Sequence, residues 1–176
     1  MPRILDRMPF PNQPGEVAVR GTRVPVRADQ LIVWISLGLP RIDAQRPAAV
    51  PFPAILDTGH SHSFAISERH LLEWAGLRTE ILAPRGAVRD RGRKLLLWNA
   101  SLWAHANKPR SREQLADRPA QLLEASAGIA VYPGGDFPRL PILGLRAIAE
   151  NNLLLKIDGP KRQATLRTPF RWRVFS

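Results

Sequence analysis

A short polar stretch, DTGHSHS at residues 57–63, directly follows the apolar run AIL at residues 54–56. Asp, Thr and Gly are all good turn formers, so the three residues alone indicate only a turn. The apolar run predicts a buried strand that delivers the carboxylate of Asp57 into this turn. Such a position is costly for a carboxylate that is neither used nor paired. We therefore take Asp57 as a candidate catalytic residue.

The chemistry open to such a carboxylate is acid–base catalysis by a pair. Two carboxylates about 3 Å apart cannot both ionise, so they share one proton. One then acts as a general base on a water, and the other as a general acid toward a carbonyl. The Thr58 hydroxyl can hydrogen-bond across to an opposing loop, and Gly59 lets the backbone approach closely and offers its N–H to the carboxylate.

Three segments resemble a known family. ILDTGHSHSFAI, residues 55–66, resembles the active-site loop of the aspartic peptidases. PILGL, residues 141–145, resembles their second signature, here Ile142, Leu143 and Gly144, which opens a short helix. The closing LLLKIDGPKRQATL resembles the C-terminal hairpin of bacterial single-domain members. The chain thus resembles a retropepsin-like peptidase, which implies a mainly β fold, the retropepsin-like acid protease half-barrel, with two or three short helices.

The resemblance also implies an assembly and an activity. Two-domain members carry two such motifs, whereas this chain has one, so the second carboxylate would be Asp57 of another copy across a two-fold axis. The terminal strands and active-site loops would hold this homodimer, because the strands are otherwise exposed edges. The implied activity is that of an aspartic endopeptidase acting on peptides or proteins, without a metal or organic cofactor.

A flap is expected over the substrate at residues 85–98, with RDRGR near its tip. The candidate substrate or flap residues are His60, Arg91, Gly92 and Trp98. Three features depart from the family. His60 stands where most members have Ala or Ser, and the tip has fewer glycines than the viral flaps. The region between Asp57 and Gly144 is also longer than in viral members, with an Arg-rich polar loop at 107–121. Because a fold does not by itself fix an activity, the alternative function is a non-catalytic dimerisation or binding module with the same fold.

Other candidates for chemistry are weaker. His60 and His62 lack a third metal ligand of convincing spacing. Ser61 and Ser63 lack the Gly-x-Ser-x-Gly elbow of a serine nucleophile. Two further carboxylates, Asp136 and Asp158, are interpreted as turn residues. The tryptophans are interpreted as core or interface residues, with Trp98 the one that can line a cleft from the flap side: Trp34, Trp74, Trp98, Trp103 and Trp172.

Composition restricts the function classes. The chain has 176 residues, which suits one domain, and no cysteine, which excludes disulfides and thiolate catalysis. Its formal charge is +11, but arginine is spread along the chain without a block of like charges, so nucleic-acid binding is disfavoured. Basic residues around the cleft would favour acidic substrates. No apolar run approaches the roughly 20 residues of a membrane span, and without a signal peptide we expect a cytoplasmic protein.

The remaining pattern predicts the organisation. We expect an N-terminal arm or edge strands at 1–27, the peptidase-like domain at 28–166, and a tail or edge strand at 167–176. Hairpins are predicted at Gly21-Thr22 and Asp158-Gly159, and a buried strand at 30–38. A short helix should begin after Ser67 and stop at Gly76, with Leu71, Leu72 and Ala75 on its apolar side. Residues 107–127 should form a surface loop with one helical turn.

Overall fold

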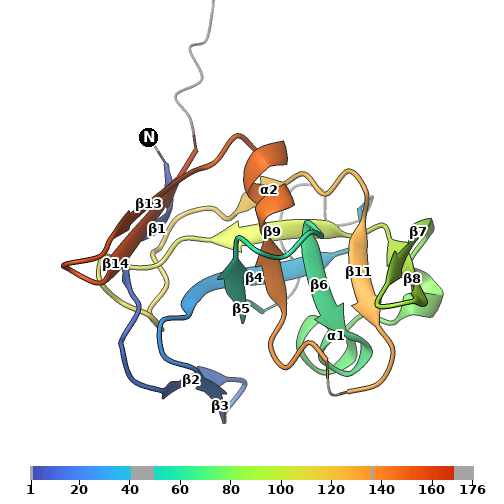
Figure 1. The fold of residues 1–176 in the computed structure, drawn as a ribbon, viewed down its shortest axis with the longest axis horizontal. Coiled ribbons are helices and arrows are strands. Elements are labelled where there is room, and N and C mark those ends of the chain that lie inside the picture. The colour runs from blue at the N-terminus through green and yellow to red at the C-terminus, as the bar shows by residue number, and fades with distance from the viewer. Residues whose placement is uncertain (1, 41–49, 136, 169–176) are drawn as a thin grey trace, which may run out of the picture.

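The computed structural model describes residues 2–40, 50–135 and 137–168 (Figure 1). The fold is mainly β, as predicted, with helices α1 (Glu68–Ala75) and α2 (Leu145–Glu150) and one 3-10 turn, η1 (Thr79–Ile81). No helix in these ranges is long and apolar enough to cross a membrane.

Most strands belong to one nine-stranded sheet. Their order across the sheet is β10 (Gln121–Leu123), β9 (Ser101–His105), β4 (Leu31–Gly38), β5 (Phe52–Asp57), β12 (Ile142–Gly144), β6 (Phe64–Ser67), β11 (Ile129–Tyr132), β8 (Arg93–Trp98) and β7 (Pro84–Asp90). The predicted buried strand is β4, in which every residue is buried. It pairs antiparallel with β5 and β9, which places β5 in the interior of the sheet and gives it a fixed register.

The sheet separates two apolar clusters. Phe64 and Ile66 of β6 pack in the main core, whereas Ala65 between them belongs to a second cluster with Leu95 and Leu97 of β8. Because successive side chains of a strand point to opposite faces, the two clusters lie on opposite sides of the sheet. The β7–β8 hairpin therefore packs through its own apolar residues rather than projecting as a free arm.

Two hairpins turn at an Arg-Gly pair. Between β2 (Gly15–Val19) and β3 (Thr22–Val26) the turn is Arg20-Gly21, one residue before the predicted position. Between β7 and β8 it is Arg91-Gly92, inside the predicted RDRGR tip. Both residues of each pair have φ between 48° and 80°. This is the geometry of a two-residue turn whose twist matches the strands, and it favours Gly at the second position.

Helix α1 follows its sequence signals. The Ser67 side chain accepts the His70 N–H, and Gly76 ends the helix with φ of 68°. Leu71, Trp74 and Ala75 are buried, but Leu72 is 45% exposed. The prediction was wrong for Leu72 because one residue rotates the helix by about 100°, away from the face that Leu71 shares with residues three and four positions later.

The chain termini form a separate three-stranded sheet, in the order β1 (Arg3–Pro9), β14 (Gln163–Arg167), β13 (Leu154–Asp158). Within the region expected as an arm or edge strands, β1 is an edge strand in which Leu5 and Met8 are fully buried. β13 and β14 form the hairpin predicted at Asp158-Gly159. The predicted edge strand of the tail lies almost entirely outside the described residues, as does Trp172.

Residues 107–127 form a connection rather than a helical turn. It contains β10 and an isolated bridge between Asn107 and Leu115. The buried Asn107 side chain accepts the Asp6 N–H at 2.7 Å and donates to the carbonyl oxygens of Asp6, Lys108 and Ser111. The Asn107 side-chain amide thus forms hydrogen bonds with backbone groups of both the loop and β1. These bonds take the place of the helical turn that we expected in this segment.

Candidate active site

Asp57 is the last residue of β5 and its side chain is exposed, as are Thr58 and Gly59. Its Oδ1 accepts the N–H of Gly59 at 2.9 Å, and its carbonyl oxygen accepts the N–H of His60 at 3.2 Å. The carboxylate is therefore oriented by its own turn. Among the described residues it has no ion pair, and the Thr58 hydroxyl has no hydrogen-bond partner.

The second predicted signature lies beside this turn. β12 runs parallel to β5, with Ile142 opposite Ile55, Leu143 opposite Leu56 and Gly144 opposite Asp57. On its other side β12 pairs antiparallel with β6. The structure thus brings together two segments that are far apart in the chain. Residues Ile142 to Gly144 of β12 lie beside the last three residues of β5, which end at Asp57.

Gly144 is held between the two ends of the Asp57 loop. Its N–H donates to the Ser63 carbonyl oxygen at 3.1 Å, and the next N–H, of Leu145, donates to the His60 carbonyl oxygen at 3.2 Å. A Cβ at position 144 would lie 2.1 Å from the His62 carbonyl oxygen and 2.7 Å from that of His60. Only glycine fits this approach, which explains the residue type in physical terms.

A carboxylate that the sequence reasoning missed supports the same loop. Glu150, at the end of α2, accepts hydrogen bonds from Ser63 at 3.1 Å, from the Ser126 hydroxyl at 2.7 Å and from Arg146 at 2.8 Å. Burial opposes its ionisation, but the hydrogen bonds from Ser126, Arg146 and Ser63 outweigh burial and lower the pKa of Glu150. The i, i+4 spacing of Arg146 and Glu150 on a helix could have predicted their ion pair. Nothing in that spacing indicates the hydrogen bond between Glu150 and Ser63.

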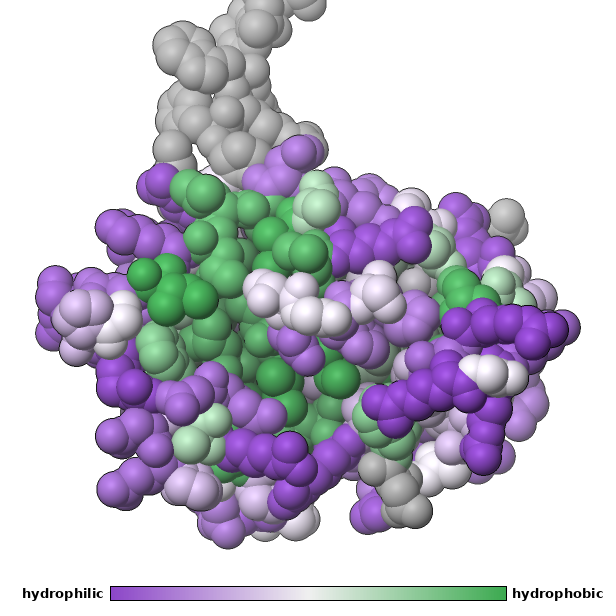
Figure 2. Space-filling view, in the orientation of Figure 1, coloured by the Kyte–Doolittle hydropathy of each residue, from purple (hydrophilic) through white to green (hydrophobic). Residues whose placement is uncertain are grey.

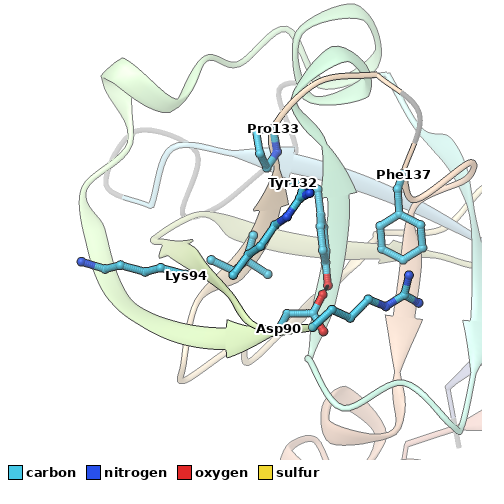
Figure 3. A pocket seen from close by; sticks show the side chains of 8 residues that line it. Asp90, Lys94, Tyr132, Pro133 and Phe137 are labelled. Atoms are coloured by element: carbon cyan, nitrogen blue, oxygen red, sulfur yellow. Dashed lines mark hydrogen bonds between the residues drawn. The ribbon is translucent and has the colours of Figure 1, made fainter.

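The predicted flap is a hairpin whose tip docks on the loop after β11. The Tyr132 hydroxyl donates to Asp90 Oδ2 at 3.0 Å, and the Arg91 guanidinium lies over the Phe137 ring at 5.0 Å (Figure 3). The rings of Tyr132 and Phe137 meet edge to face at 4.8 Å. Gly92 completes the turn. Trp98 lies at the other end of β8, where it is partly buried and packs against the main core.

His60 and His62 are both part of the Asp57 loop. Their rings meet edge to face at 5.2 Å. Burial, followed by the charge of His62, lowers the pKa of His60, while Asp57 and Asp90 oppose the change. Burial also lowers the pKa of His62, again opposed by Asp90. The charge of the hairpin residue Asp90 therefore acts on both histidines beside Asp57.

The other candidates are accounted for by local structure. Within the described ranges no three His, Asp or Glu side chains are grouped as a metal site requires. Ser63 is buried and donates to Glu150, which does not activate it as a nucleophile in the way a histidine base would. Asp158 accepts the Lys161 N–H within its hairpin turn, and Asp136 lies outside the described residues. The described tryptophans other than Trp98 are all buried: Trp34, Trp74 and Trp103.

Two further histidines are far from this chemistry. His70 stacks on Trp74 with ring centroids 3.9 Å apart. His105 Nε2 is 2.8 Å from the Ser36 hydroxyl. Both histidines serve the packing of the fold.

No protein-family model, no curated protein and no solved structure matches this chain. The contact between the Asp57 loop and Gly144 is therefore the main indication of function.

Proposed function

We propose that the chain is a retropepsin-like aspartic endopeptidase that works as a homodimer, with Asp57 of each subunit forming the catalytic pair. The observation that carries the proposal is the contact between the Asp57 turn and Gly144. A carboxylate-bearing turn at the end of β5 is locked against a second strand by two backbone hydrogen bonds and a glycine that no larger residue can replace. This arrangement holds an exposed carboxylate rigidly, which catalysis by a pair requires.

A second copy would supply the other carboxylate of the pair, and the state of Asp57 is compatible with this. Its carboxylate is exposed, and in the part of the chain that the structure describes it accepts a hydrogen bond only from its own turn. The neighbouring Thr58 hydroxyl is likewise without a partner there. In the proposed dimer both groups would face a matching loop across a two-fold axis, where each side chain would meet its own symmetry copy.

The surface of the subunit supports association. Figure 2 shows a broad apolar area on the left and centre of this face, bordered by hydrophilic residues. The terminal sheet lies on the left in Figure 1, and its edge strand β13 exposes Leu154 by 49% and Ile157 by 56%. An exposed apolar edge strand is a surface that folded proteins usually cover. In the proposed dimer a second copy covers it.

The reaction is hydrolysis of a peptide bond. One ionised Asp57 takes a proton from water as the water oxygen bonds to the scissile carbonyl carbon, and the protonated Asp57 of the partner subunit gives its proton to the carbonyl oxygen. The Asp57 that took the water proton then gives it to the amine nitrogen while the other Asp57 takes a proton from one hydroxyl of the diol, so the C–N bond breaks, an amine and a carboxylic acid remain, and the pair again holds one proton. The pair titrates as a unit, so both pKa values belong to the dimer.

The direct test compares wild type with Asp57→Asn. The asparagine side chain keeps an oxygen for the Gly59 N–H, so the variant should fold and dimerise like wild type while peptide cleavage across acidic to neutral pH falls by at least about a thousandfold. Sedimentation of both proteins measures the dimer. Cleavage that is equal in the two proteins excludes the proposed mechanism. A folded dimer without activity in wild type would favour the non-catalytic binding module instead.

A further inference from the structure

A pocket of about 450 Å³ lies beside the tip of the β7–β8 hairpin. The hairpin contributes Asp90, Arg91 and Arg93, and the facing segment contributes Tyr132 and Phe137 (Figure 3). Lys94 is also at its edge, but Figure 3 shows its side chain extending away from Tyr132 and Asp90. The pocket is therefore lined by two arginines of the hairpin and two aromatic rings of the facing segment, and the Arg91 guanidinium lies over the Phe137 ring.

Among the described residues, the charges that line this pocket are not balanced. Asp90 is the one acidic side chain among the described residues that line it, and one of its oxygens is occupied by the Tyr132 hydroxyl. Burial is the main cause that raises the pKa of Tyr132 to about 12, so the phenol keeps its proton and remains the donor in this bond. Within the described ranges neither Arg91 nor Arg93 forms an ion pair. Arg91 already lies over the Phe137 ring, so among the described residues Arg93 is the guanidinium group of this pocket that remains available to a ligand.

The pocket is next to the Asp57 loop. Asp90 lines it, and the charge of Asp90 acts on both His60 and His62. Phe137 forms a second link, since it also lines a neighbouring hollow with Ile55 and Ile142. Ile55 lies two residues before Asp57 and therefore on the same face of β5. An extended peptide that passes Asp57 can therefore place a side chain in the pocket.

From these observations we infer that the pocket between the hairpin tip and Phe137 binds an acidic side chain of the peptide, with Arg93 as the main specificity-determining residue. Guanidinium groups bind carboxylates through paired hydrogen bonds. Glutamate suits the site better than aspartate, because its longer apolar stem can lie against Phe137 and Pro133 while the carboxylate reaches the arginines. This inference deepens the proposed function and rests on it for the identity of the ligand as a substrate.

The experiment measures binding rather than cleavage. Two pools of short fluorescent peptides differ only in one central residue, Glu or Gln, flanked by mixed uncharged residues. Fluorescence anisotropy measures their affinity for the full chain carrying Asp57→Asn, a substitution that prevents turnover. We expect the Glu pool to bind about tenfold more tightly than the Gln pool, the effect of one charge-assisted pair. Equal affinity for the two pools overturns the inference.

Matched variants separate the pocket from net charge. Arg93→Gln should remove the preference for Glu, and Arg93→Lys should restore part of it. Arg89→Gln removes the same charge from the same hairpin, but Arg89 is exposed, pairs with Lys94 in the ladder and does not line the pocket. It should leave the preference unchanged. An equal loss in Arg89→Gln and Arg93→Gln would mean that overall charge, and not this pocket, attracts the peptide.

Two more outcomes keep the conclusions distinct. If a single-stranded DNA oligonucleotide binds more tightly than the Glu pool and depends equally on Arg89 and Arg93, the hairpin is a nucleic-acid surface and the inference is wrong. If wild type cleaves neither pool while the Arg93-dependent preference is present, the pocket is confirmed and the peptidase proposal fails.

Discussion

Gly144 lies opposite Asp57 in the parallel ladder of β12 and β5, with no room for a side chain between β12 and the Asp57 loop. A Cβ there would be 2.1 Å from the His62 carbonyl oxygen. Since that neighbour is backbone, it cannot rotate away as a flexible side chain could. The conformation of the Asp57 loop therefore requires glycine at position 144.

Gly144→Ala should consequently displace the loop and destabilise the fold. Overpacking of this kind costs about 1–3 kcal/mol, and a backbone neighbour puts the change at the upper end. Urea unfolding measures the loss of stability, and the peptidase assay measures the displacement of Asp57. The control is Gly86→Ala in β7, where a Cβ meets nothing within 4 Å and stability should change by less than about 0.5 kcal/mol. A Gly144→Ala protein as stable as wild type would contradict the contact.

Asp90→Asn should lower the pKa values of His60 and His62. Burial lowers the pKa values of both histidines, and the charge of the Asp90 carboxylate partly offsets this effect. Removing that charge should therefore lower both pKa values further. Titration of the histidine ring signals by NMR measures the shift. Asp158→Asn, in the β13–β14 turn, removes the same charge and should leave both values unchanged. Unchanged titrations in Asp90→Asn would mean that the hairpin tip lies away from the Asp57 loop in solution.

Local signals in the sequence predicted much of this fold. The alternation and turn residues indicated β4, the hairpins and the cap of α1, because each depends on residues close together in the chain. The family resemblance singled out the segments that contain Asp57 and Gly144, and the structure places these two residues opposite each other. The retropepsin half-barrel itself belongs to the proposal, because the sheet order alone does not identify it.

Features that depend on distant residues were not predicted. The burial of Leu5 and Met8 in β1 requires β14, which lies at the other end of the chain. Glu150 bonds to Ser63 and Ser126, and no pattern within α2 identifies these partners. The Asp90–Tyr132 bond likewise joins residues 42 positions apart. Sequence patterns report the local backbone preference, whereas these contacts are decided by packing.

Glu150→Gln should destabilise the protein at neutral pH and have less effect in acid. Hydrogen bonds lower the folded pKa of Glu150 below its ordinary value of 4.5. Its contribution is therefore present above that value and is lost as pH falls through the lowered folded pKa. We expect a loss of about 1–3 kcal/mol at pH 7 in urea unfolding.

The control for Glu150 is Glu73→Gln, which removes a carboxylate from an exposed i, i+4 pair with Arg69. Such a pair contributes less than about 1 kcal/mol. Because Glu150 also holds Ser63, its variant should reduce peptidase activity as well, whereas Glu73→Gln should not. A loss for Glu150→Gln that is the same at neutral pH and in strong acid would show that the ionised form contributes nothing.

The stability of the wild-type protein should fall as pH decreases from 6.5 to about 4, with His105 as the main titrating histidine. Burial lowers the pKa of His105 from 6.5 to about 4. In this window the unfolded chain binds a proton that the folded protein does not, so acid favours unfolding by at most about 3 kcal/mol from this residue. His105→Gln keeps a partner for Ser36 and does not titrate, so its stability should depend less steeply on pH. His62→Gln should flatten the curve less, and an unchanged slope in His105→Gln would contradict a neutral, buried His105.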